Sequence, residues 1–181
     1  MEHIPFEFID KVIDTICKTP HHTYLLLTKR PKRALEFCQW WLKKHNQTTL
    51  PENIHLGVTV CNQQEADEKI PTLLQIPATK RWISIEPMLE KIDIMPFTHI
   101  GTATFNKEKQ TITSRRLSWA YKTFDWVVLG GESGAKARPM HPDWARSVRD
   151  QCEAAGVPFY MKQMSGRKPI PGDLRIREMP K

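Results

Sequence analysis

Runs of consecutive apolar residues alternate along the chain with segments in which apolar residues recur every three to four positions. Five of these runs have the length of a strand and end in polar residues or glycine; they cover residues 24–28, 54–60, 81–85, 127–129 and 157–161. A continuous apolar run indicates a strand buried on both faces, as in a parallel sheet.

Helical periodicity separates most of these runs. Apolar residues at 6, 9, 12, 13 and 16 define one face of a first helix. Pro31 suits the first position of a second helix, and Asn62 with Glu65 forms a capping-box pattern before a third. Pro142 opens the last clear helix and Gly156 ends it. Strands alternating with helices predict an α/β fold with a parallel sheet of about five strands.

No linker or low-complexity tract divides the chain, so residues 1–181 are expected to form a single domain. The polar segment 98–118 breaks the alternation and is predicted to be a surface insertion; its threonine-rich alternation suits a hairpin. Prolines break the tail, residues 166–181, too often for a regular element.

Composition limits the setting in which the protein works. No run reaches the roughly 20 apolar residues of a membrane span, and the first residues lack the pattern of a signal peptide. We therefore expect a cytoplasmic protein without membrane contact. The formal net charge of +7 suits an anionic partner, either a small molecule or a nucleic acid, and equally suits a solvated surface.

Four cysteines are scattered along the chain without a CxxC pair, and no spacing of His, Cys and Asp predicts a metal site. Disulfides are not expected in an intracellular chain. Cys17, Cys38 and Cys152 fall in helices and are predicted to be small core or near-core residues. Cys61 differs, because it follows a strand at the edge where a site is expected.

The stretch from Asp125 to Ser133 carries the strongest functional signal. Its apolar strand ends in Gly130 and Gly131, which permit a sharp turn and a close approach of the backbone to a ligand. Glu132 and Ser133 then lie at the carboxyl end of the strand, where α/β proteins place their chemistry. Glu132 is a candidate catalytic residue, and both glycines and Ser133 are candidate cofactor contacts.

Glu86 ends another strand and is held in direction by the following proline. It could act as a general base or bind a ribose or an amine; the structural alternative is a salt bridge to Lys29 or Lys162. Lys162 and Gln163 follow the last strand and are candidate cofactor contacts.

Basic residues at other strand ends suit an anion. Lys29 and Arg30 could hold a phosphate or a carboxylate, or could be solvated loop charges. Arg138 could close over an anion beside the glycine turn, and His141 lies near the start of the following helix.

Several of these segments, taken in order, resemble the phage gene-product thirty-seven/sixty-eight family, whose members have no assigned activity. The matching blocks are Thr28-Lys-Arg-Pro31, His55-Leu-Gly-Val-Thr-Val60, Asp67-Glu-Lys-Ile-Pro71, Ser84-Ile-Glu-Pro87, Gly130-Gly-Glu-Ser-Gly134, Ala137-Arg-Pro-Met-His-Pro-Asp-Trp144 and Phe159-Tyr-Met-Lys-Gln163. That family is similar to radical S-adenosylmethionine enzymes. The resemblance implies a partial TIM-type (β/α) barrel and S-adenosylmethionine as cofactor.

Family members usually carry a cysteine-rich motif that binds a four-iron cluster, and this sequence lacks it. The resemblance therefore implies a barrel that is N-terminally truncated relative to the family, with the iron-sulfur ligands absent from this chain. One hypothesis is the C-terminal part of a radical enzyme, with Glu86, Glu132 and Lys162 lining a pocket. Such a chain would need a Cys-rich segment, expected upstream, or a second copy as partner.

A second hypothesis is a non-catalytic module that binds a nucleotide or nucleic acid. A third is a cluster-free barrel enzyme that uses Glu132 as its base.

Overall fold

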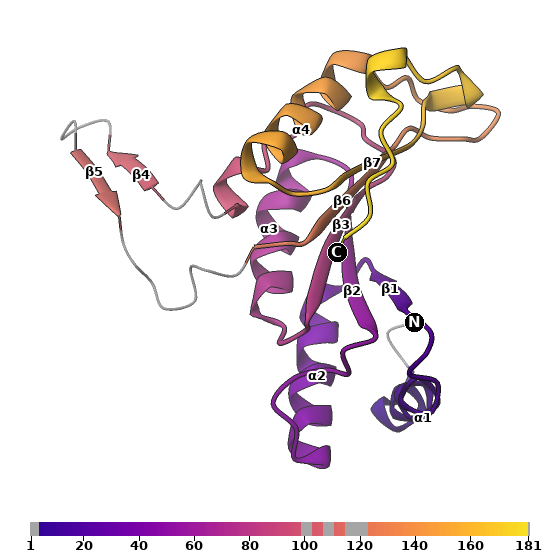
Figure 1. Ribbon diagram of the computed structural model, residues 1–181, viewed down its shortest axis with the longest axis vertical. Coiled ribbons are helices and arrows are strands. Elements are labelled where there is room, and N and C mark those ends of the chain that lie inside the picture. Colours follow the sequence, from indigo (N-terminus) through magenta and orange to yellow (C-terminus); the bar gives the residue numbers. More distant parts are fainter. Residues whose placement is uncertain (1–3, 99–102, 107–110, 115–122, 181) are drawn as a thin grey trace.

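Five parallel strands form the main sheet of this protein, in the order β1-β2-β3-β6-β7 (Figure 1). The structure is a computed structural model that describes residues 4–98, 103–106, 111–114 and 123–180. The strands are β1 (Tyr24–Thr28), β2 (Ile54–Val60), β3 (Lys80–Ile85), β6 (Trp126–Gly130) and β7 (Phe159–Gln163). The predicted α/β class with a parallel sheet is confirmed. The sheet remains open between β1 and β7 in the described ranges, so no barrel closure is seen.

Four α-helices accompany these strands: α1 (Phe6–Cys17), α2 (Pro31–His45), α3 (Gln63–Gln75) and α4 (Pro142–Ala155). Several helix ends lie at the residues that the sequence pattern predicted. Pro31 is the first residue of α2, and Gly156 adopts a left-handed φ of 64° directly after α4. Asn62 caps α3 by accepting a hydrogen bond of 2.8 Å from the Glu65 amide. The Glu65 carboxylate accepts from the amide of Cys61, one residue earlier than a capping box requires.

The main core lies between these helices and one face of the sheet. Side chains in register across the strands supply that face, and Val58, Ile83 and Val127 are fully buried there. Residues from all four helices complete the same cluster. Burial of this continuous apolar layer is the main favourable term in folding. It also fixes the strand ends relative to one another.

A smaller aromatic cluster covers the opposite face. Trp82 and Trp126 are buried there with Val128, and their ring centroids lie 5.5 Å apart. The Trp82 indole lies flat over Gly57 and donates a hydrogen bond of 3.1 Å to the carbonyl of His55. A Cβ at position 57 would lie 2.6 Å from Trp82 Nε1, so this close approach requires glycine.

The tail covers the outer edge of β7. Arg177 forms an antiparallel bridge with Tyr160, and the amide of Met161 donates to the carbonyl of Ile176 at 2.8 Å. In its described part the tail has no strand or α-helix; the single-turn helices η2 (Ser165–Arg167) and η3 (Gly172–Leu174) lie at its start and within it. A third such turn, η1 (Met95–Phe97), precedes the insertion.

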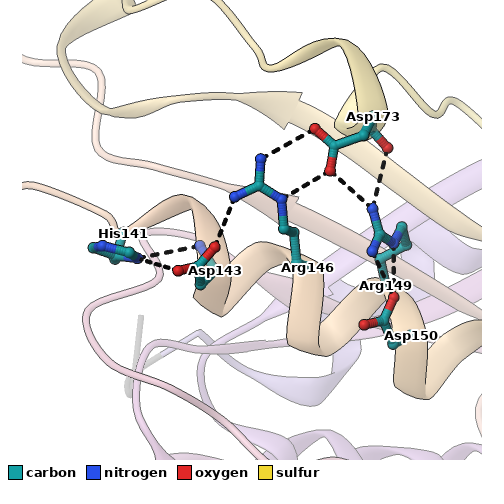
Figure 2. Close-up of polar contacts among 6 residues, drawn as sticks. All are labelled: His141, Asp143, Arg146, Arg149, Asp150 and Asp173. Atoms are coloured by element: carbon teal, nitrogen blue, oxygen red, sulfur yellow. Dashed lines mark hydrogen bonds and ion pairs between the residues drawn. The ribbon is translucent and has the colours of Figure 1, made fainter.

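Two arginines on α4 hold the tail in this position (Figure 2). Arg146 Nε donates to the Asp173 carboxylate at 2.8 Å, and Arg149 NH1 donates to the same carboxylate at 3.0 Å. The neighbouring Leu174 is fully buried in the main core. Within η3, the tail is therefore attached by the ion pairs of Asp173 and by the burial of Leu174.

Within the segment 98–118, β4 (Ala103–Asn106) and β5 (Thr111–Ser114) pair antiparallel, as the predicted hairpin requires. The rest of that segment, beyond Thr98, lies outside the described residues, and its role as a surface insertion stays a prediction. Across the described ranges, none of the helices has the length and apolar character of a membrane span.

Candidate functional site

Glu86 lies at the centre of a polar network that joins two strand ends. It follows β3, and its carboxylate lies 3.0 Å from Lys162 Nζ and 2.6 Å from Gln163 Nε2, both on β7. β6 lies between these strands in the sheet. Of Glu86, Glu132 and Lys162, which were expected to line one pocket, Glu86 and Lys162 are in contact here, and Gln163 joins them. The Glu86–Lys162 contact takes the form of the salt bridge that the sequence offered as the structural alternative for Glu86.

The glycines of β6 make room for this network. A Cβ at Gly130 would lie 3.0 Å from the Gln163 amide nitrogen and 3.3 Å from Glu86 Oε1. The same Gln163 amide donates to the carbonyl of Gly131 at 2.8 Å. A Cβ at Gly131 would collide with the backbone of Ser165. Gly131 therefore requires glycine for this close approach, whereas a Cβ at Gly130 would press on the ends of two side chains; neither glycine has a positive φ.

Glu132 is engaged in a separate pair. Arg138 Nε and NH2 donate to its two oxygens at 3.0 and 2.9 Å, and the Arg138 amide donates at 2.8 Å. These hydrogen bonds lower the pKa of Glu132 to about 2. A carboxylate held in this way is a weak proton acceptor, so the base role predicted for Glu132 would first require the Arg138 pair to open. The anion over which Arg138 closes is Glu132.

The remaining predicted residues lie around the same edge of the sheet. Lys29 and Arg30 follow β1, and the Arg30 amide donates to Thr28 Oγ1 at 3.0 Å. Ser133 is exposed in the loop after β6. His141 caps α4, its Nδ1 accepting from the Asp143 amide at 3.2 Å (Figure 2). The structure gives His141 a structural contact and brings it to none of the Glu86 partners.

Cys61 belongs to the network through its thiol, which points at the carbonyl of Glu86 at 3.8 Å. Burial raises the pKa of this thiol, and the negative charge of Glu65 raises it further. Position 61 continues the alternation of β2 on the face that carries Glu86. The alternation of β2 could therefore have predicted that Cys61 lies next to Glu86.

The cysteines do not converge. All four are free; Cys38 and Cys152 are buried as predicted, Cys61 is half-buried, and Cys17 is exposed. The core assignment of Cys17 was wrong, because it ends α1 outside the buried stripe formed by Ile13 and Ile16. An iron-sulfur cluster needs three or four thiolates around one centre. The cysteines of this chain do not provide that arrangement.

Among the described residues, one group of side chains has the spacing of metal ligands. It consists of Asp10, Asp14 and His45 on α1 and α2. Asp10 is already bonded there to Lys44 Nζ at 2.6 Å and to His45 Nε2 at 2.8 Å. This group serves to join two helices and lies outside the strand-end network.

Taken together, the fold and this edge define an α/β protein with an open parallel sheet and a charged network at its carboxyl end. A family model described as a protein of unknown function, DUF5131, matches residues 1–172. The chain belongs to this family. Comparison with curated proteins and with solved structures finds no match.

Proposed function

We propose that this chain is the C-terminal part of a radical S-adenosylmethionine-like protein of the phage gene-product thirty-seven/sixty-eight type. Its own contribution is to hold a nucleoside-containing ligand at the strand ends, without iron-sulfur chemistry. The observation that carries this proposal is the convergence of Glu86, Lys162 and Gln163, closely packed against the backbone of Gly130 and Gly131. The reaction of the complete assembly is left unassigned.

The chemistry of the network suits such a ligand. S-adenosylmethionine carries an amino acid end with an ammonium and a carboxylate, besides the hydroxyls of its ribose. The Glu86 carboxylate can accept from the ammonium or the hydroxyls, and Lys162 can pair with the ligand carboxylate. Because the amino acid end of the ligand is zwitterionic, it can replace the contacts within the Glu86–Lys162 pair and give each of these two side chains a partner of opposite charge.

The positions of the cysteines do not suit an iron-sulfur cluster held by this chain alone. Its four thiols are spread over α1, α2, α4 and the end of β2, and they do not converge. A cluster, if the assembly uses one, would come from a Cys-rich segment or from another chain. The residues described above would then bind and orient the ligand.

Calorimetric titration with S-adenosylmethionine, together with anaerobic iron and sulfide analysis after reconstitution, tests this proposal. We expect binding without stoichiometric iron. Glu86→Gln should weaken binding roughly tenfold to hundredfold, the range for loss of a charged hydrogen bond. Glu153→Gln, at an exposed position on α4, is the matched control and should bind normally. Iron near four per chain, or equal binding by Glu86→Gln, would contradict the proposal.

The positive charge of the chain favours a second candidate, a module that binds a nucleotide or a nucleic acid. The net charge is +7, and Lys29 and Arg30 follow β1, at the same carboxyl-end edge of the sheet as the network. Binding of a single-stranded oligonucleotide at increasing salt separates the two candidates. A steep loss of affinity with salt, reduced in Lys29→Gln, supports the nucleic-acid module. Undetectable oligonucleotide binding at low salt eliminates it.

A further inference from the structure

Strand β1 exposes two large apolar side chains on the face opposite the helices. Leu25 is 45 % exposed and Leu27 is 48 % exposed. Their neighbours on the same face of the sheet are covered: Trp82, which is level with Leu27 in the strand register, is 7 % exposed. The aromatic cluster thus stops short of β1, and the apolar surface continues past it without a cover.

On the helix side, an open groove of about 630 Å³ runs between α1, β1 and α2. Its walls include Ile9 and Ile13 of α1, Phe37 of α2 and Leu26 of β1. Leu27, whose side chain lies on the opposite face of β1, is also among the residues that line the groove. A gap of this size within an apolar layer lacks the packing that protein interiors normally have.

The two edges of the sheet differ. The tail covers β7 by backbone hydrogen bonds through Ile176 and Glu178. β1 pairs with β2 on one side and has no strand beside its other side in the described part of the chain. A bare edge with apolar side chains is a template for another strand.

Basic side chains lie at one end of the groove. Lys29 and Arg33 line it where β1 ends, and none of the described residues that line it is acidic. Arg33 is partly engaged, donating to the carbonyl of Ile4 at 2.7 Å. An occupant with a carboxylate at this end would be matched in charge.

We propose that β1 is a docking edge for an extended segment of a partner polypeptide, with apolar side chains on both faces and an acidic residue at the carboxyl end of β1. Such a strand would fill the groove with one set of side chains, cover Leu25 and Leu27 with the alternate set, and pair the bare edge. An acyl chain would fill the groove but leave the edge unpaired. A second copy paired through β1 would bring no acidic residue, because residues 18–30 contain none. The inference rests on α1, β1 and α2 and is independent of the strand-end ligand.

A selection from displayed random peptides against the full chain tests the proposal. We expect enriched peptides to contain a run of consecutive apolar residues and to carry Asp or Glu, and to slow amide exchange in residues 24–28 when bound. Leu27→Lys should weaken a selected peptide at least tenfold. Val12→Lys, at a 43 % exposed apolar position on α1 outside the groove, is the matched control and should leave binding unchanged. Lys29→Glu should shift the selection toward basic peptides.

The competing occupants give different outcomes. Failure to enrich any peptide, or enriched peptides that leave β1 exchange and the Leu27→Lys variant unaffected, would overturn the proposal. Protection of β1 that rises with protein concentration, together with dimers in light scattering, would assign the edge to a second copy. Filling of the groove by dodecanoate with unchanged β1 exchange, and no peptide binding, would assign it to an amphiphile.

Discussion

Substitution of Gly57 by alanine tests the packing of the aromatic face that supports the strand ends. The added methyl group would overlap the Trp82 indole, which lies flat on β2 at this point. The indole would have to move, losing its hydrogen bond to the His55 carbonyl and its contact with Trp126. Overpacking of a core costs about 1–3 kcal/mol, and a lost hydrogen bond costs about 1 kcal/mol. We therefore expect Gly57→Ala to lower the free energy of unfolding by about 2–4 kcal/mol.

Urea denaturation followed by circular dichroism measures this change, with tryptophan fluorescence as a second probe. Gly134→Ala is the matched control, because a Cβ there meets nothing within 4 Å; it should change stability by less than about 0.5 kcal/mol. Trp82→Leu in the Gly57→Ala background should recover part of the loss, because the smaller side chain leaves room for the methyl group. A coupling energy of about 1 kcal/mol or more is expected between the two substitutions. Strictly additive effects, or a Gly57→Ala protein as stable as the parent, would refute the packing argument.

Three further outcomes follow from the charges and thiols. Asp173→Asn should speed amide exchange along β7. The same loosening should appear in the parent protein as pH falls from about 4 through about 2. The arginines lower the pKa of Asp173 from 3.8 to about 2, so its carboxylate is protonated only in that pH range. The Glu132 carboxyl should titrate near 2 by NMR and shift back toward 4.5 in Arg138→Gln; a parent midpoint near 4.5 would contradict the observed ion pair. Cys17 should react with a thiol reagent well before Cys38, whose thiol is buried with a pKa raised to about 11, and equal rates would contradict these positions.

The fold was predictable from local sequence signals, because each helix and strand contains a pattern that marks it. The buried strands are continuous apolar runs, and proline, asparagine or glycine marks the helix ends at Pro31, Asn62 and Gly156. The expected convergence of Glu86 and Lys162 also followed from strand geometry, because carboxyl ends of parallel strands share one edge. These inferences needed no information about distant contacts.

Contacts between remote segments were not predictable in the same way. The attachment of Asp173 to Arg146 joins residues 27 positions apart, and neither periodicity nor turn chemistry links them. The path of the tail along β7 depends on backbone hydrogen bonds, which carry no residue signature. The pairing of Glu132 with Arg138 depends on the course of an irregular loop, so the sequence indicated an arginine ready for an anion but not which anion it meets.

The two carboxylates at the strand ends differ in what a ligand must displace. Glu132 is fixed by hydrogen bonds from both the side chain and the backbone of Arg138, six residues away in the same loop. Glu86 is held by a lysine and an amide side chain from β7, and the lysine can move its charge without any change in the backbone. The zwitterionic amino acid end of a ligand can therefore replace the contacts within the Glu86–Lys162 pair, while the pair at Glu132 remains closed. Glu86 is thus the carboxylate that we expect a ligand to engage first. Glu132, through its pair with Arg138, holds the loop that follows the two glycines.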